Sequence, residues 1–337
     1  MFSRFVAVLC ISAAALLAAC GGSQPPIGAL GEMPQSRVIA TQAKHAGSWT
    51  LPAKGSNLLY VTDGYENVYV YEYPQGKLVG MLTGFIAPLG ECADSNGDVF
   101  IVAAASKSYS SSVIYEYAHG GSNPVKTLED PVFSGGCAVD PRSGDLAVAG
   151  VHGVAVYQSA SGDPTMFYNN AFSFFNCGYD KDGNLYLSGS NGVYGNQSQL
   201  IRLANGSSTF EQINLDVTLY TNESGPFLPS VQWDGKHVTV SSTTRDQEPP
   251  GPASVYRLKI SGSSASAIGT TTLQGEKDHF SGQLVIRGKT IIGGTYYKGH
   301  TFFSRWSYPH GGQPRRDVRT ISDAHLWGVA VSVAPSR

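Results

Sequence analysis

Residues 91–102 read ECADSNGDVFIV: a short apolar segment, a polar turn that contains glycine, and a second segment of alternating apolar residues. The same pattern returns at 136–149 (GCAVDPRSGDLAVA) and at 176–189 (NCGYDKDGNLYLSG). Degenerate copies follow at 230–242 (SVQWDGKHVTVSS) and at 281–294 (SGQLVIRGKTIIGG). Alternating apolar residues separated by turn residues predict antiparallel strands, and their regular recurrence predicts a repeat architecture.

A second recurring unit is a Tyr or Leu that leads into a polar turn containing Gly. Its copies are 40 to 55 residues apart and read YPQGK (73–77), YAHGGSNP (117–124), YQSASGDP (157–164), LANGSS (203–208), LKISGSS (258–264) and YPHGGQP (308–314). Short β-branched and aromatic runs such as VYVYEY (68–73) lie between the two kinds of unit. Four short strands per repeat of roughly 40–50 residues are typical of a propeller blade. The sequence therefore predicts an all-β, six-bladed β-propeller with four antiparallel strands in each blade.

The two ends of the repeat region predict how the ring closes. The chain finishes with LWGVAVSVAP (326–335), which matches the first strand of a repeat but has no strands after it. The region begins at 57–84 with three strands and no inner strand before them. Because an open ring would expose unpaired strand edges, we expect the C-terminal strand to complete the first blade. This assigns the propeller to residues 51–337.

The composition excludes several classes of protein. Charged residues make up only 14% of the chain and hydrophobic residues 42%, which fits neither a long coiled coil nor a disordered protein. The formal net charge is −2, so no excess of Lys and Arg suggests a nucleic-acid partner.

The first twenty residues, MFSRFVAVLCISAAALLAAC, predict where the protein goes. Arg4 precedes an apolar stretch that ends in small residues, as in a bacterial signal peptide. The terminal LAAC resembles the lipobox of bacterial lipoproteins, which implies cleavage of residues 1–19 and acylation of Cys20. Residues 20–50 then form the lipidated Cys20 and a flexible tether to the bilayer. Since Gly21 and not Asp follows the cysteine, we expect a lipid-anchored protein of the bacterial cell envelope, at the outer membrane.

The repeated pattern of Ala, Asp, Gly and a hydrophobic residue resembles NHL-type repeats over about residues 57–335. It also resembles, more distantly, the six-bladed gluconolactonase-like enzymes. More narrowly, the chain is similar to uncharacterised bacterial lipoprotein propellers that carry EYxxGG and CxxDxxGN-like repeats. The resemblance implies the blade structure and says little about activity.

The gluconolactonase-like resemblance also implies a possible divalent metal at the channel mouth, held by carboxylate and Asn side chains. The loop that supplies an acidic ligand in those enzymes reads Pro88-Leu89-Gly90 here, so that ligand is missing. The residues that could partly replace it are Glu91, Asn176, Glu223, Asp278 and Asp323. Nothing in their spacing requires a metal, and we predict neither a metal nor another cofactor.

Cys92, Cys137 and Cys177 occupy the same position in three consecutive repeats. Metal-binding cysteines usually occur in local pairs such as C-x-x-C, which are absent here. A disulfide requires Cα atoms within about 7 Å, whereas packed sheets lie about 10 Å apart. We therefore expect the three side chains to fill space in the inner strands, and any further role stays open.

Other repeated polar residues are expected to be structural. Asp94, Asp140 and Asp180 precede the glycine of the repeated turn, where an Asp side chain can cap the bend. His119 and His310 occupy equivalent HGG turns and are expected at the surface, far from the channel. The chain has no G-x-S-x-G motif, and no catalytic residue is predicted.

The candidate binding face is the mouth of the channel, where the longer loops should converge. These loops are 106–112, 169–175, 214–229 and 243–253. The aromatic residues expected at the mouth are Phe85, Phe133, Phe172, Phe174, Phe227, Phe280 and Trp327, and the polar ones are Glu91, Asn176, Glu223, His279 and His325. Aromatic rings offer a large contact area at low entropic cost, but the same rings could merely plug the channel.

These observations favour a membrane-anchored extracytoplasmic module for binding or scaffolding, with an unknown protein, peptide or glycan as its ligand. The alternative is a metal-dependent sugar-lactone hydrolase or a related propeller enzyme. No motif identifies the ligand.

Overall fold

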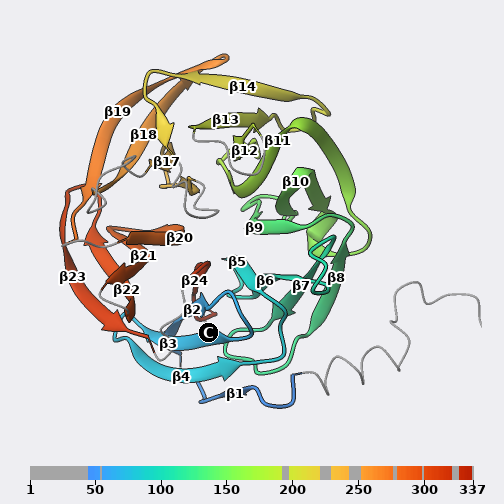
Figure 1. Ribbon diagram of the computed structural model, residues 1–337, viewed down its shortest axis with the longest axis vertical. Helices are drawn as coiled ribbons and strands as arrows, with labels where there is room; N and C mark the ends of the chain where they lie inside the picture. The colour runs from blue at the N-terminus through green and yellow to red at the C-terminus, as the bar shows by residue number, and fades with distance from the viewer. Residues whose placement is uncertain are drawn as a thin grey trace, which may run out of the picture.

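The computed structural model describes residues 45–53, 55–191, 197–220, 229–242, 252–275, 279–297, 300–320 and 326–335. This part of the chain is all-β, with no α-helix and with a single 3₁₀ turn at Gln158–Ala160. No helix in the described residues is long and apolar enough to cross a membrane. The sheets stand around a central axis, with β5, β9, β20 and β24 near the middle and β4, β8, β14 and β23 at the circumference (Figure 1).

The first sheet joins the two ends of the described chain. Its strands, in spatial order, are β1 (Trp49–Thr50), β4 (Lys77–Leu82), β3 (Val68–Tyr73), β2 (Asn57–Thr62) and β24 (Val329–Ser332). Strands β2 and β24 pair antiparallel, with Leu58 opposite Ser332 and Val61 opposite Val329. The Gly328 backbone N–H also donates a 2.7 Å hydrogen bond to Thr62 Oγ1. The C-terminal strand therefore lies beside the first strand of the repeat region.

The second sheet contains one complete repeat in chain order. Its four strands are β5 (Pro88–Ala93), β6 (Val99–Ala104), β7 (Ser112–Tyr117) and β8 (Lys126–Asp130). Every residue of β6 is buried, because this strand lies between two others within its sheet and the neighbouring sheets cover both of its faces. Such strands read as continuous apolar runs, here VFIVAA.

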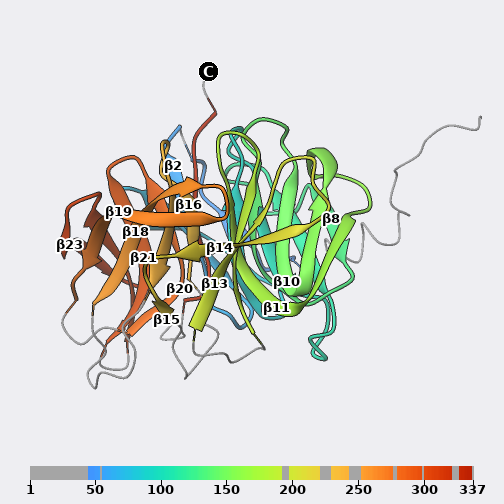
Figure 2. The ribbon, with the colours of Figure 1, turned by 90° about the horizontal axis from the view of Figure 1, so that it is seen from above.

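The remaining fifteen strands are connected by hydrogen bonds into one continuous sheet. They are β9 (Ser134–Val139), β10 (Leu146–Tyr157), β11 (Thr165–Tyr179), β12 (Leu185–Ser190), β13 (Gln197–Leu203), β14 (Phe210–Leu215), β15 (Leu219–Tyr220), β16 (Val231–Trp233), β17 (Val238–Ser242), β18 (Ala253–Ser261), β19 (Ser264–Leu273), β20 (His279–Arg287), β21 (Thr290–Tyr297), β22 (His300–Ser307) and β23 (Gly311–Arg319). Some connections are short: β14 and β19 pair through two residues each, and β19 and β23 through one. The side view shows β13, β14 and β19 on the near side of the ring (Figure 2).

The core is divided into clusters that lie between neighbouring sheets. One cluster, for example, packs Leu58 and Val70 of the first sheet against Ile101 and Tyr115 of the second. The next packs Phe100 against residues that include Val148 of the following sheet. Each sheet thus buries both faces against its neighbours, as expected for radially packed repeats.

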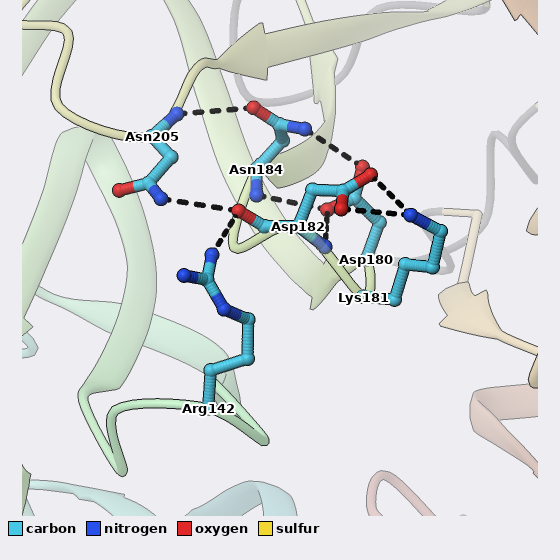
Figure 3. A network of polar contacts seen from close by, with 6 residues as sticks. All are labelled: Arg142, Asp180, Lys181, Asp182, Asn184 and Asn205. Carbon is cyan, nitrogen blue, oxygen red and sulfur yellow. Dashed lines mark hydrogen bonds and ion pairs between the residues drawn. The ribbon is translucent and has the colours of Figure 1, made fainter.

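The turn between the first two strands of a repeat is held by its aspartate, as the sequence predicted. Asp180 Oδ1 accepts backbone N–H bonds from Asp182 and Asn184 at 2.9 Å, and Oδ2 accepts one from Asn184 Nδ2 (Figure 3). Asp94 and Asp140 accept equivalent backbone bonds. In Figure 3, Arg142 from the preceding repeat and Asn205 both donate to the Asp182 carbonyl oxygen, so the turn also links neighbouring hairpins.

Two expectations about the boundaries of elements are wrong. Residues 169–175, expected as a loop, lie inside β11, where residues 169–172 bulge between the Tyr168–Gly153 and Ser173–Val151 pairs. Residues 45–50, expected in the tether, pack on the first sheet. There His45 Nδ1 lies 2.5 Å from the Thr83 carbonyl oxygen and 3.2 Å from Tyr117 Oη, and its ring contacts Phe85. Because the His45 ring is buried among these side chains, the fold begins before residue 51.

Candidate functional site

A cavity of about 330 Å³ opens at the end of the channel where the inner strands begin. Its wall comes from β5, β9, β10, β11 and β20, from loops that include the β6–β7 loop, and from Trp327, two residues before β24. The lining residues are Gly64, Ala87, Leu89, Gly90, Tyr109, Phe133, Gly135, Val151, Phe175, Asn176, Gly282, Gln283 and Trp327. We call this the mouth cavity. None of these lining residues is charged, so the cavity suits an uncharged group.

Aromatic rings form much of the mouth cavity. Tyr109, in the β6–β7 loop, is 50% exposed and stands edge-on to Phe133, with ring centroids 5.5 Å apart. Trp327 is fixed by its backbone N–H, which donates to the Thr62 carbonyl oxygen at 3.2 Å. A Cβ at Gly64 would lie 2.1 Å from Trp327 Cδ1, so this glycine makes the space for the indole. The indole of Trp327 is thus held in place before any ligand arrives.

Two amide side chains supply hydrogen-bonding groups in the mouth cavity. Asn176 lies on β11, and its side chain is nearly buried. Gln283 lies on β20, where its backbone N–H donates to the Trp327 carbonyl oxygen at 2.8 Å. Its Oε1 accepts the Glu91 backbone N–H at 3.2 Å. Two amides beside aromatic rings can orient a ligand through both donors and acceptors.

Glu91 lies deeper than the sequence suggested. It does not line the mouth cavity but a second cavity of about 270 Å³ along the channel, which we call the channel cavity. Gln283 lines both cavities. Glu91 has no exposed surface, and this burial raises the pKa of its carboxyl group well above the ordinary value. The nearby backbone N–H of Thr62 opposes that shift.

The aromatic residues expected at the mouth divide into two groups. Phe133 and Trp327 line the mouth cavity. Phe85 and Phe174 are instead buried between sheets, where Phe85 contacts Tyr115 and Phe174 contacts Phe210. Phe172 stacks on Phe174, with ring centroids 6.4 Å apart, and does not line the cavity. Phe85 and Phe174 therefore serve packing, as the alternative interpretation of these rings proposed.

Several expected site residues lie outside the described part of the chain. These are Cys20, Glu223, Phe227, Asp278, Asp323 and His325. His279 and Phe280 belong to β20, but their side chains are not described. Tyr109, Phe175 and Gln283 line the mouth cavity but were not predicted individually, although Tyr109 and Phe175 fall within the loops 106–112 and 169–175 that were expected on this face.

The expectation that the repeat cysteines only pack is wrong for two of them. Cys92 on β5 and Cys137 on β9 form a disulfide, with their Cα atoms 5.6 Å apart. The inner strands converge on the axis, so the Cα atoms of Cys92 and Cys137 lie closer together than the spacing of about 10 Å between packed sheets. A Cβ at Gly90 would lie 2.2 Å from the Gly135 carbonyl oxygen, so the two backbones touch there. Cys177 is a free, buried cysteine whose thiol donates to the Ala147 carbonyl oxygen.

The expectation of a surface turn at His119 is also wrong. Its Nδ1 lies 2.6 Å from Ser332 Oγ on β24, and its Nε2 lies 3.1 Å from the Ser56 carbonyl oxygen. The half-buried ring therefore connects the second sheet to the C-terminal strand, and this burial lowers the pKa of His119. His310, in the equivalent turn, is exposed.

The donors proposed for a metal are not gathered in the described part of the chain. Asn176 lines the mouth cavity and Glu91 the channel cavity. No group of three His, Cys, Asp or Glu side chains suited to a metal ion occurs among the residues that the structure describes.

Comparison with known proteins shows the fold. No family model and no curated protein matches the sequence. Solved structures do match: a chain of a nidogen/laminin complex has a TM-score of 0.59 at 11% identity and covers 84% of this chain and 100% of its own. A protein of unknown function from Bacteroides caccae has a TM-score of 0.57 at 11% identity, with 82% and 99% covered. A functionally unknown protein from Desulfotomaculum acetoxidans DSM 771 has a TM-score of 0.51 at 13% identity, with 86% and 89% covered. The chain thus has a β-propeller-like fold.

Proposed function

We propose that the protein is a lipid-anchored extracytoplasmic module that binds its ligand in the mouth cavity, without catalysing a reaction. The observation that carries this proposal is the cavity wall itself, with aromatic rings, two amides and no charged residue. Pockets of this kind bind through apolar area and use a few polar groups for orientation. The ligand would present an uncharged group, as a peptide side chain or a sugar ring of a glycan does.

The architecture that we propose is a ring of six NHL-like blades, with β24 as the inner strand of the first blade. The channel cavity supports this number, because β5, β9, β11, β16, β20 and β24 each contribute residues to its wall. The pairing of β24 with β2 supports the closure. A closed ring would hold the mouth residues in fixed positions, which favours binding.

The proposed location is the bacterial cell envelope, with acylated Cys20 in the lipid bilayer and residues 21–44 as the connection to the fold. The Cys92–Cys137 disulfide supports a compartment outside the cytoplasm, because disulfides persist in oxidising environments. Cys20→Ala should release the protein from the membrane fraction and abolish labelling by a palmitate analogue. A variant that stays membrane-bound would contradict the anchor.

The test of the binding proposal compares two exposed tyrosines. Arrays of peptides and of glycans, including peptidoglycan fragments, are screened with the wild type, and the recovered ligand is then titrated into two variants. Tyr109→Ala removes a ring from the mouth cavity, whereas Tyr168→Ala removes one that is 64% exposed and lies outside it. We expect Tyr109→Ala to weaken binding about tenfold, the effect of about 1.4 kcal/mol, and Tyr168→Ala to change nothing. Equal binding by both variants would place the site elsewhere.

The competing function is a metal-dependent sugar-lactone hydrolase. Metal analysis of the purified protein separates the two proposals. Ca²⁺, Zn²⁺ or Mn²⁺ in a one-to-one ratio with the protein would favour the enzyme.

A further inference from the structure

The channel cavity, of about 270 Å³, reaches the end of the channel opposite the mouth cavity. Its wall includes the last residue of five inner strands, namely β5, β9, β11, β16 and β20. These residues are Ala93, Val139, Tyr179, Trp233 and Arg287. We call the part of the channel cavity that they surround the exit.

One side of the channel cavity is apolar. Val285 on β20 packs with Val329 and Val331 on β24, and all three line the cavity. The Cys92–Cys137 disulfide lines it as well. A wall of this kind favours an alkyl group, because the group leaves water when it binds.

Arg287 is the charged residue of this wall that solvent reaches. The other charged residue, Glu91, is completely buried, and the backbone N–H of Thr62 is its hydrogen-bond partner. Arg287 is exposed, and its side chain makes no ion pair or hydrogen bond with the residues that the structure describes. Side chains alternate along a strand, so Arg287 lies on the same face of β20 as Val285. A positive charge thus borders the apolar side at the exit.

The strands next to β20 supply no acid to neutralise Arg287. Neither β16 (Val231–Trp233) nor β24 (Val329–Ser332) contains a carboxylate. Asp234, in the turn after β16, is already used: its carboxylate accepts the backbone N–H groups of Lys236 and His237 and the hydroxyl group of Tyr308. The guanidinium group at the exit is therefore available to an anion from outside the protein.

We propose that the exit binds a small carboxylate with an apolar tail. The planar guanidinium group of Arg287 offers paired N–H donors that match the two oxygens of a carboxylate. The tail lies along Val285 and Val331, between the inner strands. An inorganic anion would use the charge but not the apolar side. This site does not depend on the proposed function, because the two cavities share only Gln283 among their lining residues.

The first experiment tests the charge. The probes are butanoate and butanamide, which have nearly the same shape but differ in charge. Each is titrated calorimetrically into the wild type, Arg287→Gln and Lys289→Gln. Lys289 is the matched control, because it is an exposed cation two residues beyond Arg287 that does not line the cavity. We expect the wild type and Lys289→Gln to bind butanoate about tenfold more tightly than butanamide, and Arg287→Gln to lose that preference.

The second experiment tests the apolar tail. Acetate, propanoate and butanoate are titrated into the wild type under the same conditions. Each added methylene group that is buried should strengthen binding about fourfold. Thermal melting shows whether Arg287→Gln is folded, which we expect because an exposed side chain is replaced.

Several results would overturn the proposal. Butanoate could fail to bind the wild type, could bind it no better than butanamide, or could bind folded Arg287→Gln as tightly as the wild type. Equal affinities for acetate and butanoate would mean that Arg287 pairs with anions at the surface only, and an equal loss in Lys289→Gln would mean that the charge acts from a distance. A loss of array binding by Tyr109→Ala with no butanoate binding would retain the mouth site and exclude this one.

Discussion

The junction of β5 with β9 and the junction of β9 with β11 are built from the same repeat, yet they are held together differently. At the first, a Cβ on Gly90 would lie 2.2 Å from the Gly135 carbonyl oxygen; at the second, a Cβ on Gly136 would lie 2.5 Å from that of Phe175. Both pairs of backbones are therefore too close to admit a Cβ without a shift. Only the first junction is cross-linked, because Cys137 is already bonded to Cys92 and leaves Cys177 unpaired.

The residue before each repeat cysteine also differs between the junctions. It is Glu91 in β5, Gly136 in β9 and Asn176 in β11. Glu91 is a fully buried acid in the channel cavity, and Asn176 is an amide in the mouth cavity. The repeat thus maintains the backbone path, while single positions beside the cysteines give each part of the channel its own chemistry.

The largest expected effect is the loss of the cross-link at the first junction. The disulfide closes a loop with a sequence separation of 45 residues, so its removal should cost about 3–4 kcal/mol of unfolding free energy through the entropy of the unfolded chain. We expect the Cys92→Ala/Cys137→Ala double variant to melt roughly 10 °C below the wild type. Reducing agent should lower the wild-type melting temperature similarly and leave the double variant unchanged. A wild type that melts equally with and without reductant would contradict this.

A methyl group at the contact point should disturb both junctions. Gly90→Ala places its Cβ against a backbone oxygen that cannot rotate away, and we expect a loss of about 3 kcal/mol in urea unfolding. Gly136→Ala should cost a similar amount. The junctions should differ in reducing agent: without the disulfide β5 can move away from β9, so Gly90→Ala should cost less, whereas the cost of Gly136→Ala should not change. Equal behaviour of the two variants would mean that the disulfide does not set the spacing.

The sequence predicted the repeated features well and the differences between repeats poorly. Strand alternation and the turn aspartates act locally, so Asp94, Asp140 and Asp180 could be assigned from the pattern alone. The approach of Gly90 to Gly135 depends on how sheets converge at the axis, which no local pattern contains. For this reason the Cys92–Cys137 disulfide was missed, and so was the position of Gln283 beside Glu91, 192 residues away in the chain. Phe172 and Phe174 were placed at the mouth because proximity to an inner strand does not reveal which side a ring faces.

The Glu91 carboxyl group on β5 should make the stability of the fold depend on pH. Burial raises the pKa of Glu91 in the folded state above its unfolded value. Folding therefore favours the protonated form, and stability is lost as the pH rises above the unfolded value toward the folded one. Glu91→Gln removes this dependence, so the variant should be more stable than the wild type at pH 8, with a smaller difference at pH 4.5. The matched change at the second junction is Asn176→Asp, which places a carboxyl group at the position in β11 that corresponds to Glu91 in β5. Wild-type and Glu91→Gln melting curves that shift together with pH would contradict the assignment.

The smallest expected effect concerns the unpaired cysteine at the second junction. Cys177 packs in the apolar cluster that includes Phe174 and Leu187, and burial raises the pKa of its thiol to about 12. Cys177→Ala removes one sulfur atom and its weak hydrogen bond to the Ala147 carbonyl oxygen, so we expect a loss of about 1 kcal/mol in urea unfolding. The thiolate is the reactive form of cysteine, so Cys177 should resist a maleimide in the native state at pH 7.5 and react once urea unfolds the chain. The same experiment on the reduced protein sharpens the contrast between the junctions, since half-buried Cys92 should then react before Cys177. Rapid native labelling of Cys177 in the oxidised protein would show that the second junction opens more readily than its packing implies.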